Sequence, residues 1–455
     1  MIRRSKIFFS AIGILLLAEF TGQSFTCREL TEPAIAVAPE GQVITVGHHD
    51  ADISGTDNLA IQAAVDLLNS RGGGTVVILP GEYILNNSIY LRSNVNISGD
   101  KKSTVLKRCP ALSSRLLVDA DRFQKEITPA DPSLFKPGMG IICRSNNLMN
   151  VMTDDPFTIT AIEDGKLFVN HFILHDFTAD TDSQGEGGHN GLVANVFPML
   201  LGSCIENVTI DGLTIDAQTE ENPGWQNVRT AGILFATCEN SVIRNVRISH
   251  VQGDGMTIAH GSKNITVENC ETSYNTYHGI HPGSHSTFIT VKNCHMHHNG
   301  SDGLYICWGI KNSRFLDNII HHNGIRKVGK RNGISIGHKD TDNLISGNHI
   351  FENAISGIHF RKKSEANGAH FNTITDNVIE NNGLPEHTGK GYGIYINGIT
   401  HDLIIKNNTI RETRSGNERF QKTGIFISTG ASRVHLMGND MNGHADKDVI
   451  DESGK

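Results

Sequence analysis

The sequence GMTI at 255–258 returns as GIHP at 279–282, GLYI at 303–306, GISI at 333–336 and GIHF at 357–360. Each copy is a glycine followed by an apolar residue, a variable residue and a second apolar residue. Successive glycines lie 24, 24, 30 and 24 residues apart, so the repeat spans about two dozen residues with one six-residue insertion. Repeats of this length are typical of solenoids, in which each unit packs on the next.

Two further segments of alternating apolar residues follow in each repeat, as in Ile265-Thr266-Val267, and each leads into an Asn-rich corner. Three short strands and three corners per repeat describe one coil of a parallel β-helix, whose strands are stable only when stacked. A helical solenoid would need apolar-faced runs of ten or more residues, and the repeat is too rich in Gly, Asn and β-branched residues for that. We therefore predict an all-β chain folded as a single parallel β-helix.

Some polar positions are expected to stack from coil to coil. Asparagine stands four residues before the pattern glycine, or before the insertion that precedes it, at Asn275, Asn299, Asn323 and Asn353. Stacked amides satisfy corner backbone groups and each other. Cys270 and Cys294 also lie 24 residues apart, and strands about 4.8 Å apart would allow a disulfide. We expect buried free thiols instead.

Residues 1–24 have the pattern of a secretory signal peptide. Arg3, Arg4 and Lys6 precede an apolar run over residues 7–20, and small residues follow it. The run is too short and wrongly flanked for a permanent membrane span. We expect a secreted or periplasmic protein with no membrane-spanning segment.

The remaining chain divides into four segments. We predict an N-terminal cap with the first coils at 40–100, a β insertion at 101–200, the main β-helix at 201–441 and a weakly ordered polar tail at 442–455. The cap contains an amphipathic helix over 57–69, whose apolar side is predicted to carry Leu59, Ile61, Ala63, Ala64, Leu67 and Leu68. Such a helix would cover the open end of the solenoid. The acidic stretch 174–190 reads as a loop that overhangs a groove.

The sequence of this cap resembles that of a known protein family. The helix is followed by a triple glycine at 72–74, an apolar strand at 75–79 and the sequence PGEY at 80–83. This order, from Ala60 to Tyr83, resembles the N-terminal segment of pectate-lyase-like β-helix proteins. The resemblance implies a right-handed parallel β-helix that acts on an acidic polysaccharide along one sheet, as a uronate lyase, a C5-epimerase or a glycoside hydrolase.

Alternation along the strands places the residue before each glycine, and the third residue of each pattern, on the outer face. This face concentrates residues that transfer protons and stack on sugars, whereas an ordinary solvated face carries mostly Lys, Glu, Ser and Thr. The candidate catalytic residues are His281, Tyr305, His338, Arg361 and Asp302. The candidate substrate-binding residues are His278, Trp308, Lys339, His359, Lys362, Tyr395, Asp254 and His260.

A lyase and a C5-epimerase both begin by removing the proton from C5, with a cation that stabilises the carboxylate-derived enediolate. His281 or His338 is the candidate base, and Tyr305 is the candidate acid or activated base. The candidate carboxylate neutralisers are Arg361, Lys362 and Lys339. Because strand alternation turns His281 and Arg361 outward, we expect neither side chain in the core.

Two alternatives stay open. Asp254 and Asp302 occupy the same position two coils apart, and a separation of about 9.6 Å is near the upper end for the carboxylate pair of an inverting hydrolase. The chain could also be a non-catalytic polysaccharide-binding β-helix, since a fold does not dictate activity.

The segment 279–286 also bears a distant resemblance to the motif region of alginate C5-epimerases, which carries Asp-Pro-His-Asp after Gly-Ile or Gly-Val. Only Pro282 matches this motif. His281 stands in place of the first Asp and Gly283 in place of the His, while Trp308 falls near the family's neutralising Arg. The catalytic residues of that family therefore do not carry over to this chain.

We predict no metal site. The pairs His297-His298 and His321-His322 precede corner asparagines and have no carboxylate or thiolate at ligand spacing nearby in the sequence, so they are interpreted as surface residues. No cofactor is expected, and calcium is left open only by the resemblance, without an acidic cluster to support it. The chain has no dominant basic patch, so nucleic acid is excluded as a partner. We expect a monomer with a polysaccharide substrate.

Overall fold

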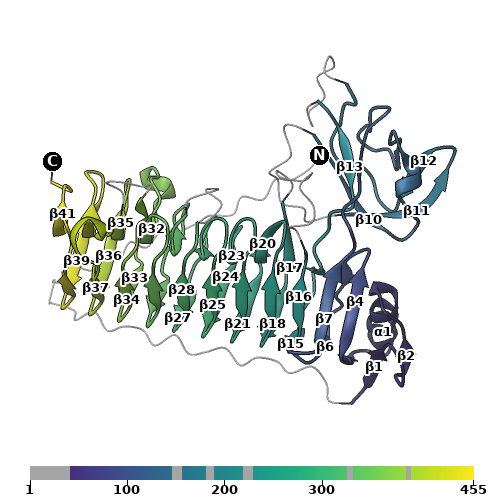
Figure 1. The fold of residues 1–455 in the computed structure, drawn as a ribbon, viewed down its shortest axis with the longest axis horizontal. Helices are drawn as coiled ribbons and strands as arrows, with labels where there is room; N and C mark the ends of the chain where they lie inside the picture. Colours follow the sequence, from purple (N-terminus) through teal and green to yellow (C-terminus); the bar gives the residue numbers. More distant parts are fainter. Residues whose placement is uncertain are drawn as a thin grey trace, which may run out of the picture. The chain divides into compact units, whose positions relative to one another are not determined.

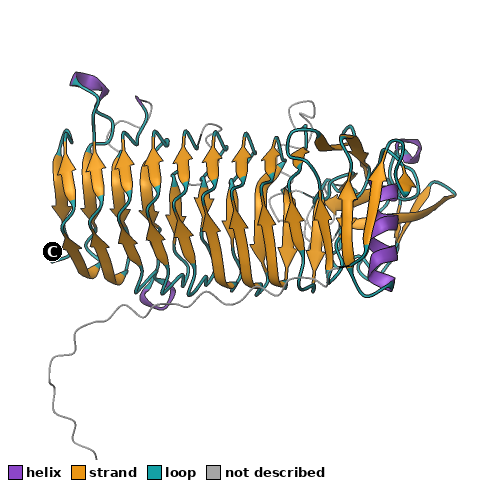
Figure 2. Cartoon of the chain, turned by 90° about the horizontal axis from the view of Figure 1, so that it is seen from below, coloured by secondary structure: helices purple, strands orange, loops and turns teal. Residues whose placement is uncertain are grey.

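The structure is a computed structural model that describes residues 41–145, 156–180, 189–218, 229–324, 331–385 and 391–454. Within these residues three long parallel sheets of 13, 11 and 11 strands run along a row of coils, and the coils lie side by side (Figure 1). Each coil of the chain adds one strand to each sheet, with short corners between them (Figure 2). The predicted parallel β-helix is therefore confirmed. The predicted signal peptide lies outside the described residues.

Sheet A contains, in spatial order, β2 (Ile53–Ser54), β1 (Val43–Gly47), β3 (Gly74–Ile78), β6 (Val95–Ser98), β15 (Thr209–Asp211), β18 (Glu239–Arg244), β21 (Lys263–Glu268), β24 (Thr287–Lys292), β27 (Arg314–Leu316), β30 (Leu344–Ser346), β33 (Thr373–Thr375), β36 (His401–Lys406) and β39 (Ser432–Met437). Sheet B contains β4 (Gly81–Leu85), β7 (Thr104–Arg108), β16 (Thr214–Asp216), β19 (Arg247–Ser249), β22 (Glu271–Ser273), β25 (His295–His297), β28 (Ile319–His321), β31 (His349–Phe351), β34 (Val378–Glu380), β37 (Thr409–Arg411) and β40 (Asp440–Asn442).

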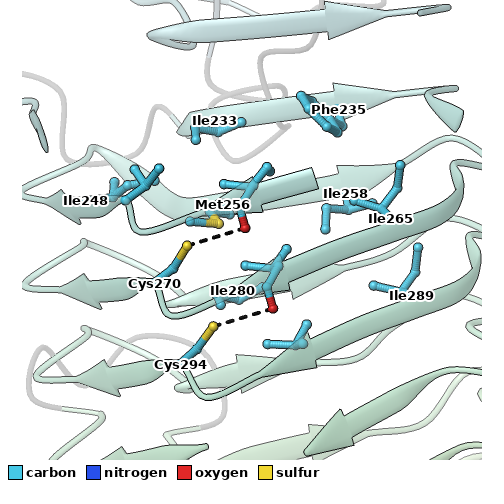
Figure 3. Close-up of a cluster of buried hydrophobic side chains, with 14 of the residues drawn as sticks. Ile233, Phe235, Ile248, Met256, Ile258, Ile265, Cys270, Ile280, Ile289 and Cys294 are labelled. Carbon is cyan, nitrogen blue, oxygen red and sulfur yellow. Dashed lines mark hydrogen bonds between the residues drawn. The ribbon is translucent and has the colours of Figure 1, made fainter. Parts of the chain in front are cut away.

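Sheet C carries the glycine patterns. It contains β5 (Ile89–Tyr90), β14 (Leu200–Ser203), β17 (Thr230–Ala236), β20 (Gly253–Ala259), β23 (Ile280–Pro282), β26 (Leu304–Tyr305), β29 (Ile334–Ile336), β32 (Ser356–Phe360), β35 (Tyr392–Ile396), β38 (Thr423–Ile427) and β41 (Lys447–Asp451). The apolar residue after each glycine pairs in register with its counterpart in the next coil, giving a column of Met256, Ile280, Leu304, Ile334, Ile358 and Ile394. All six side chains are fully buried, as predicted, and Figure 3 shows Met256 and Ile280 in successive coils.

The stacked cysteines are free thiols. No cysteine in the described part of the chain is bonded to another cysteine. The Cys270 thiol donates to the carbonyl oxygen of Ile243 at 3.6 Å, and the Cys294 thiol donates to that of Val267 at 3.7 Å (Figure 3). The two residues therefore fill the same core position in successive coils, and the prediction of buried thiols is confirmed.

The predicted asparagine column forms a continuous ladder of side-chain hydrogen bonds. The Nδ2 atom of each residue donates to the Oδ1 atom of the next at 2.9–3.0 Å, along Asn275, Asn299, Asn323, Asn353 and Asn382. Gln421 continues the ladder, accepting from Asn382 at 3.0 Å. Buried corner backbone groups need such partners, because water does not reach them.

Replacing Asn353 with alanine is expected to lower the free energy of unfolding by about 2 kcal/mol. Its amide donates to the buried carbonyl oxygen of Ile320 and the partly buried carbonyl oxygen of Phe351, both at 3.1 Å, and alanine removes this donor from both. Chemical denaturation measures the change. Asn417→Ala, at an exposed position, is the control and should stay within about 0.5 kcal/mol of the native protein. Equal stability of both variants would show that the ladder contributes nothing.

The single α-helix of the described residues, α1 (Asn58–Ser70), lies at the N-terminal end of the coils (Figures 1 and 2). The Asp57 carboxylate caps it by accepting from the backbone N–H of Leu59 at 2.9 Å. The predicted apolar side is partly wrong, because Leu59, Ala63 and Leu67 are exposed while Val65 is buried instead. The rotation of the helix is set by contact with the sheets, which the sequence pattern alone does not fix.

The insertion forms an antiparallel sheet of six strands, in the order β8 (Ser113–Arg115), β13 (Leu192–Ala194), β10 (Gly140–Arg144), β11 (Phe157–Glu163), β12 (Lys166–Val169) and β9 (Glu126–Ile127). A short 3₁₀ helix, η1, spans Pro132–Leu134. The strand β7 pairs with β4 and β16, so the first residues of the predicted insertion belong to the β-helix. Residues 181–188 of the predicted overhanging loop lie outside the described residues.

The sequence predicted a weakly ordered polar tail at 442–455, but the structure shows a strand in this segment. Strand β41 pairs in parallel with β38 and adds one more strand to sheet C. Two further 3₁₀ helices, η4 (Glu365–Asn367) and η6 (Gly416–Glu418), lie in corners of the late coils. No helix of the described residues is long and apolar enough to cross a membrane.

Candidate active site

Outward side chains of sheet C gather where β20, β23 and β26 lie side by side. Thr257 of β20 pairs in register with His281 of β23, and Tyr305 comes from the next strand, β26. Asp254 lies on β20, and its counterpart Asp302 lies just before β26. Strand alternation in three successive coils thus brings together five polar side chains that lie far apart in the sequence.

Asp254 is buried and fully hydrogen-bonded. Its Oδ2 atom accepts from Arg229 Nη2 at 2.6 Å and from Thr257 Oγ1 at 3.0 Å, and lies 2.8 Å from His281 Nδ1. Burial alone would raise the pKa of Asp254, but the charges of Arg229 and His278 and the hydrogen bond from His281 hold it well below its usual range. Asp254 is therefore ionised at neutral pH.

His281 has one ring nitrogen fixed and the other available. Since Nδ1 faces the Asp254 carboxylate, it carries the proton, and Nε2 keeps its lone pair. A side chain at Gly283 would place its Cβ 3.0 Å from Nε2, so the glycine leaves this atom uncovered. Burial, helped by the charge of Arg229, lowers the pKa of His281 to about 4 against the opposing effect of Asp254. The imidazole is neutral at neutral pH, and 14% of its side chain is exposed.

Tyr305 lies against both histidines of the site. Its ring stacks on His278 with centroids 4.1 Å apart and planes 4° apart, and meets His281 edge-on at 5.0 Å. The guanidinium carbon of Arg361 lies 4.4 Å from the same ring centroid. Burial raises the pKa of Tyr305 well above its usual range. The phenol therefore stays protonated at neutral pH.

Arg361 is not the exposed cation that the sequence predicted. Only 4% of it is exposed, and its Nη2 atom donates to the carbonyl oxygens of Ile306 at 2.7 Å and Gly337 at 3.1 Å. The same atom lies 3.5 Å from the buried carboxylate of Asp340. Arg361 follows the last residue of β32, and its side chain folds over Gly337, whose missing Cβ leaves the space. It packs against the ring of Tyr305 within the protein.

Asp302 is also buried, against the prediction of an outward carboxylate. Its Oδ1 atom accepts from the backbone N–H of Asn332 and from Ser335 Oγ, both at 2.8 Å. Its Oδ2 atom lies 3.3 Å from His278 Nδ1. Burial opposes its ionisation, but the hydrogen bond and charge of His278, with the bonds from Asn332 and Ser335, lower its pKa. This carboxylate orients His278.

A row of polar contacts continues from Tyr305 along the coils. The Cys307 sulfur lies 3.6 Å from Tyr305 Oη and 3.5 Å from His338 Nδ1. His338 Nε2 in turn contacts Lys363 Nζ. Burial, together with the charge of Lys363, lowers the pKa of His338. The row links the side chains around His281 to a cleft further along the same sheet.

This cleft has a volume of about 580 Å³ and lies at the corners that follow β29, β32, β35 and β38. It is lined by His338, Lys362, Lys363, Ser364, Asn367, Asn397, Gly398, Ile399, Ser428, Thr429 and Gly430. Trp308, which is 59% exposed, lies at its approach with its ring centroid 5.1 Å from that of His338. Two lysines and a cluster of hydroxyl and amide groups make the cleft suitable for an anionic sugar.

The other predicted residues lie outside this row. His359 of β32 stacks on Tyr395 of β35 with ring centroids 5.1 Å apart, which extends the outward aromatic surface toward β38. His260 and Lys339 lie at the corners after β20 and β29. These residues belong to the coils of sheet C. The side-chain partners of His281 among the described residues are Asp254 and Arg229 instead.

Sequence reasoning missed Arg229 and Cys307. Arg229 Nη2 donates to the Asp254 carboxylate at 2.6 Å and lies 3.0 Å from His281 Nδ1, and its guanidinium carbon lies 5.0 Å from the ring centroid of Tyr277. It precedes the first complete glycine pattern, so the repeat did not mark it. The available signal was its position 25 residues before Asp254, close to one repeat length.

One group in the described chain has three metal-ligating residues within reach of each other, Glu365, His370 and His401. His370 Nδ1 accepts from the backbone N–H of His401 at 3.2 Å, and its Nε2 lies 2.8 Å from the carbonyl oxygen of Glu365. Both ring nitrogens of His370 are therefore engaged, with the proton at Nε2. The hydrogen bonds account for this group without an ion.

Comparison with protein families gives two matches. Residues 47–305 match the family described as rhamnogalacturonase A/epimerase, pectate lyase-like, and residues 231–410 match the right handed beta helix region. A search of curated proteins by sequence found no match.

Solved structures share the fold at low sequence identity. The A-module of mannuronan C-5 epimerase AlgE4 from Azotobacter vinelandii has a TM-score of 0.52 and 14% identity, covering 86% of this chain and 93% of the module. The polygalacturonase of Erwinia carotovora has a TM-score of 0.50 and 15% identity, covering 93% and 99%. ORF18 of Geobacillus virus E2 has a TM-score of 0.53 and 12% identity, covering 88% and 62%. Because the first family match spans more than half of the chain, and the coils have the β-helix fold, the chain belongs to the rhamnogalacturonase A/epimerase, pectate lyase-like family of right-handed β-helix proteins.

Proposed function

We propose that this protein acts on an acidic polysaccharide as a uronate lyase or C5-epimerase, with His281 as the base and Tyr305 as the acid. The observation that carries the proposal is the buried Asp254 carboxylate bonded to His281 Nδ1, with the protonated phenol of Tyr305 beside the same imidazole. Family membership supports a carbohydrate substrate. A secreted or periplasmic location, expected from residues 1–24, is compatible with such a substrate.

Asp254 gives His281 the properties of a base. Its carboxylate holds the proton on Nδ1, so that Nε2 accepts the proton of the substrate, and it stabilises the imidazolium that forms. The anionic substrate adds a second negative charge, which favours the protonated imidazole further. Arg229, bonded to Asp254, supplies the nearest positive charge for the substrate carboxylate.

The proposed first step breaks the C5–H bond, with the proton passing to His281 Nε2 and the electron pair delocalised into the substrate carboxylate. In elimination this pair forms the C4–C5 double bond, the bond from C4 to its oxygen breaks, and Tyr305 protonates the leaving oxygen. In epimerisation Tyr305 returns a proton to C5 on the opposite face. The protonated phenol suits either outcome.

The inverting hydrolase is disfavoured by the burial of its two candidate carboxylates. Asp254 and Asp302 are both 0% exposed, and both are held by several hydrogen bonds inside the protein. Both pKa values are lowered, so neither group holds a proton for a leaving oxygen at neutral pH. These carboxylates position histidines.

Incubation of the purified protein with a panel of uronate polysaccharides tests the proposal. Ultraviolet absorbance that rises together with reducing ends indicates elimination. Exchange of the C5 proton in deuterated water without cleavage indicates epimerisation. Reducing ends without absorbance would replace the proposal with hydrolysis, and binding without any of these changes would leave a binding protein.

The pH profile of kcat/KM is expected to have its acid limb near pH 4. His281 is the base in its neutral form, which exists above its pKa of about 4, so activity should fall only when the pH drops through that value. An unperturbed histidine would place the limb near about 6.5. Initial rates from about pH 3 to about pH 8 at low substrate concentration measure it, and a limb near about 6.5 would point to a different base.

Replacing Trp308 with alanine is expected to weaken polysaccharide binding by about 1–3 kcal/mol, because its exposed ring at the approach to the cleft offers a stacking surface for a sugar. Calorimetric titration with an oligosaccharide measures the loss. Phe172→Ala removes a similarly exposed ring from the insertion and should leave affinity unchanged. Native affinity in Trp308→Ala would remove this residue from the binding surface.

A further inference from the structure

Four histidines form two close pairs on the outer side of sheet B, at the ends of β25 and β28. The Nδ1 atoms of His297 and His298 lie 2.9 Å apart, and those of His321 and His322 lie 2.7 Å apart. We infer that each pair of this histidine cluster, residues 297 and 298 or residues 321 and 322, binds one divalent transition-metal ion such as Ni²⁺, Cu²⁺ or Zn²⁺ through its two Nδ1 atoms. The candidate active site lies on sheet C, so this would be a second site.

The spacing within each pair suits a metal ion. Two imidazole nitrogens that lie about 2.1 Å from one ion at nearly a right angle are about 3 Å apart. Hydrogen-bonded imidazoles have a similar separation, so distance alone does not decide between a proton and a metal. The groups around the outer nitrogens, the Nε2 atoms, indicate which ring nitrogen carries the proton.

The outer nitrogen, Nε2, of three of these rings faces a group that can accept a hydrogen bond, which favours a proton on Nε2. His322 Nε2 lies 3.1 Å from a Glu352 carboxylate oxygen, and His297 Nε2 lies 3.7 Å from one of Glu271. His321 Nε2 lies 2.7 Å from His295 Nε2. A proton held on Nε2 leaves the Nδ1 lone pair for a metal, and a carboxylate behind a ligating imidazole is the usual support of such sites.

Stacking holds the two pairs in register. The rings of His297 and His321 are parallel within 11° with centroids 5.2 Å apart, and those of His298 and His322 are parallel within 9° at 4.9 Å. Each pair therefore repeats the other one coil away. Both pairs present two Nδ1 atoms at nearly the same separation on the same side of the sheet, so a metal ion could bind either pair without a rearrangement of the backbone.

The carboxylates come from coils that the sequence separates from the histidines. Glu271 lies on β22, one coil before β25, and Glu352 follows β31, one coil after β28. The carboxylates that the sequence does not place near these histidines are therefore supplied by neighbouring coils, where they lie behind the imidazoles as hydrogen-bond acceptors and not as ligands. Their two charges also offset that of a divalent ion. At about pH 7.5 ordinary imidazoles are neutral and available as ligands.

Calorimetric titration of the full-length, untagged, chelator-treated protein with NiCl₂ at about pH 7.5 tests the inference. We expect saturable binding, and none with MgCl₂, which prefers oxygen ligands. The double variant His298→Phe/His322→Phe keeps a ring at each stacked position but removes one nitrogen from each pair, and should bind Ni²⁺ at least about a hundredfold more weakly. The control His260→Phe/His285→Phe changes two exposed histidines with the same left-handed backbone and should bind like the native protein.

Two results would overturn the inference: absence of saturable Ni²⁺ binding by the native protein, or native affinity in the His298→Phe/His322→Phe variant. If that variant fails to fold, electron paramagnetic resonance of the Cu²⁺-loaded native protein decides. Coupling to at least two directly bound nitrogens supports the site, and a spectrum without nitrogen coupling rejects it.

Discussion

Replacing Asp254 with asparagine is expected to lower kcat/KM on the acidic polysaccharide by about a thousandfold or more. The carboxylate accepts the proton of His281 Nδ1 at 2.8 Å, which fixes the tautomer with a free Nε2 lone pair. An amide at this place can donate to Nδ1, which moves the proton to Nε2 and removes the base. It also removes the negative charge that stabilises the imidazolium. Initial rates at substrate concentrations well below KM measure the loss.

Two further variants separate catalysis from folding. His281→Gln keeps the ion pair of Asp254 and Arg229 and removes only the base, so it should lose at least about a hundredfold in rate with little change in stability. Thr257→Val removes another hydrogen bond to the same carboxylate without touching His281 and should lose less than about tenfold. Near-normal rates in folded Asp254→Asn and His281→Gln would refute the assignment of the base.

The coils were predictable because a β-helix turns a sequence period into a spatial translation. Residues that recur every repeat at one position, such as Met256 and Ile280 or Asn299 and Asn323, must stack. The chemical requirement of each position is then visible in the sequence, since an apolar residue fills the core and an amide satisfies a corner. The same sequence period therefore predicted the stacked apolar and asparagine residues, the stacked cysteine pair and the sheet that carries the glycine patterns.

The depth of the polar residues was not predictable in the same way. Alternation gives the direction of a side chain, but neighbours one coil away decide whether it meets water. Asp254 and Asp302 point outward from the sheet and are nonetheless covered, by His281 and His278 in particular. Arg229 lies before the first full repeat and could not be placed by the period. The period thus brought candidate residues to one sheet, but it could not distinguish the groups that face solvent from those that other side chains cover.

Replacing Arg361 with methionine is expected to lower the free energy of unfolding by about 3–5 kcal/mol, the usual cost of breaking a buried ion pair on one side. The sequence placed this side chain in solvent, where truncation would cost little. In the structure its loss leaves Asp340, which is 0% exposed, without its cation, and leaves the carbonyl oxygens of Ile306 and Gly337 without this donor. Because burial raises the pKa of Asp340 to about 7 even beside Arg361, chemical denaturation at about pH 9, where the native carboxylate is ionised, measures the change.

Arg433→Met is the matched control, since Arg433 pairs with Asp402 at 2.6 Å but is more than half exposed, and exposed pairs contribute little to stability. The double variant Arg361→Met/Asp340→Asn separates charge from packing. The Asp340→Asn change keeps an oxygen as the acceptor for the N–H groups of Gly309 and Ile310, which share Oδ1, but it puts an NH₂ group where Oδ2 accepts from the N–H of Gly337. If the unpaired charge causes the loss, the double variant is more stable than Arg361→Met alone. The variant Asp340→Asn alone measures the cost of the lost acceptor for Gly337, and if the double variant is no more stable than Arg361→Met after this cost is subtracted, the lost carbonyl partners and the lost contact with Tyr305 cause the instability.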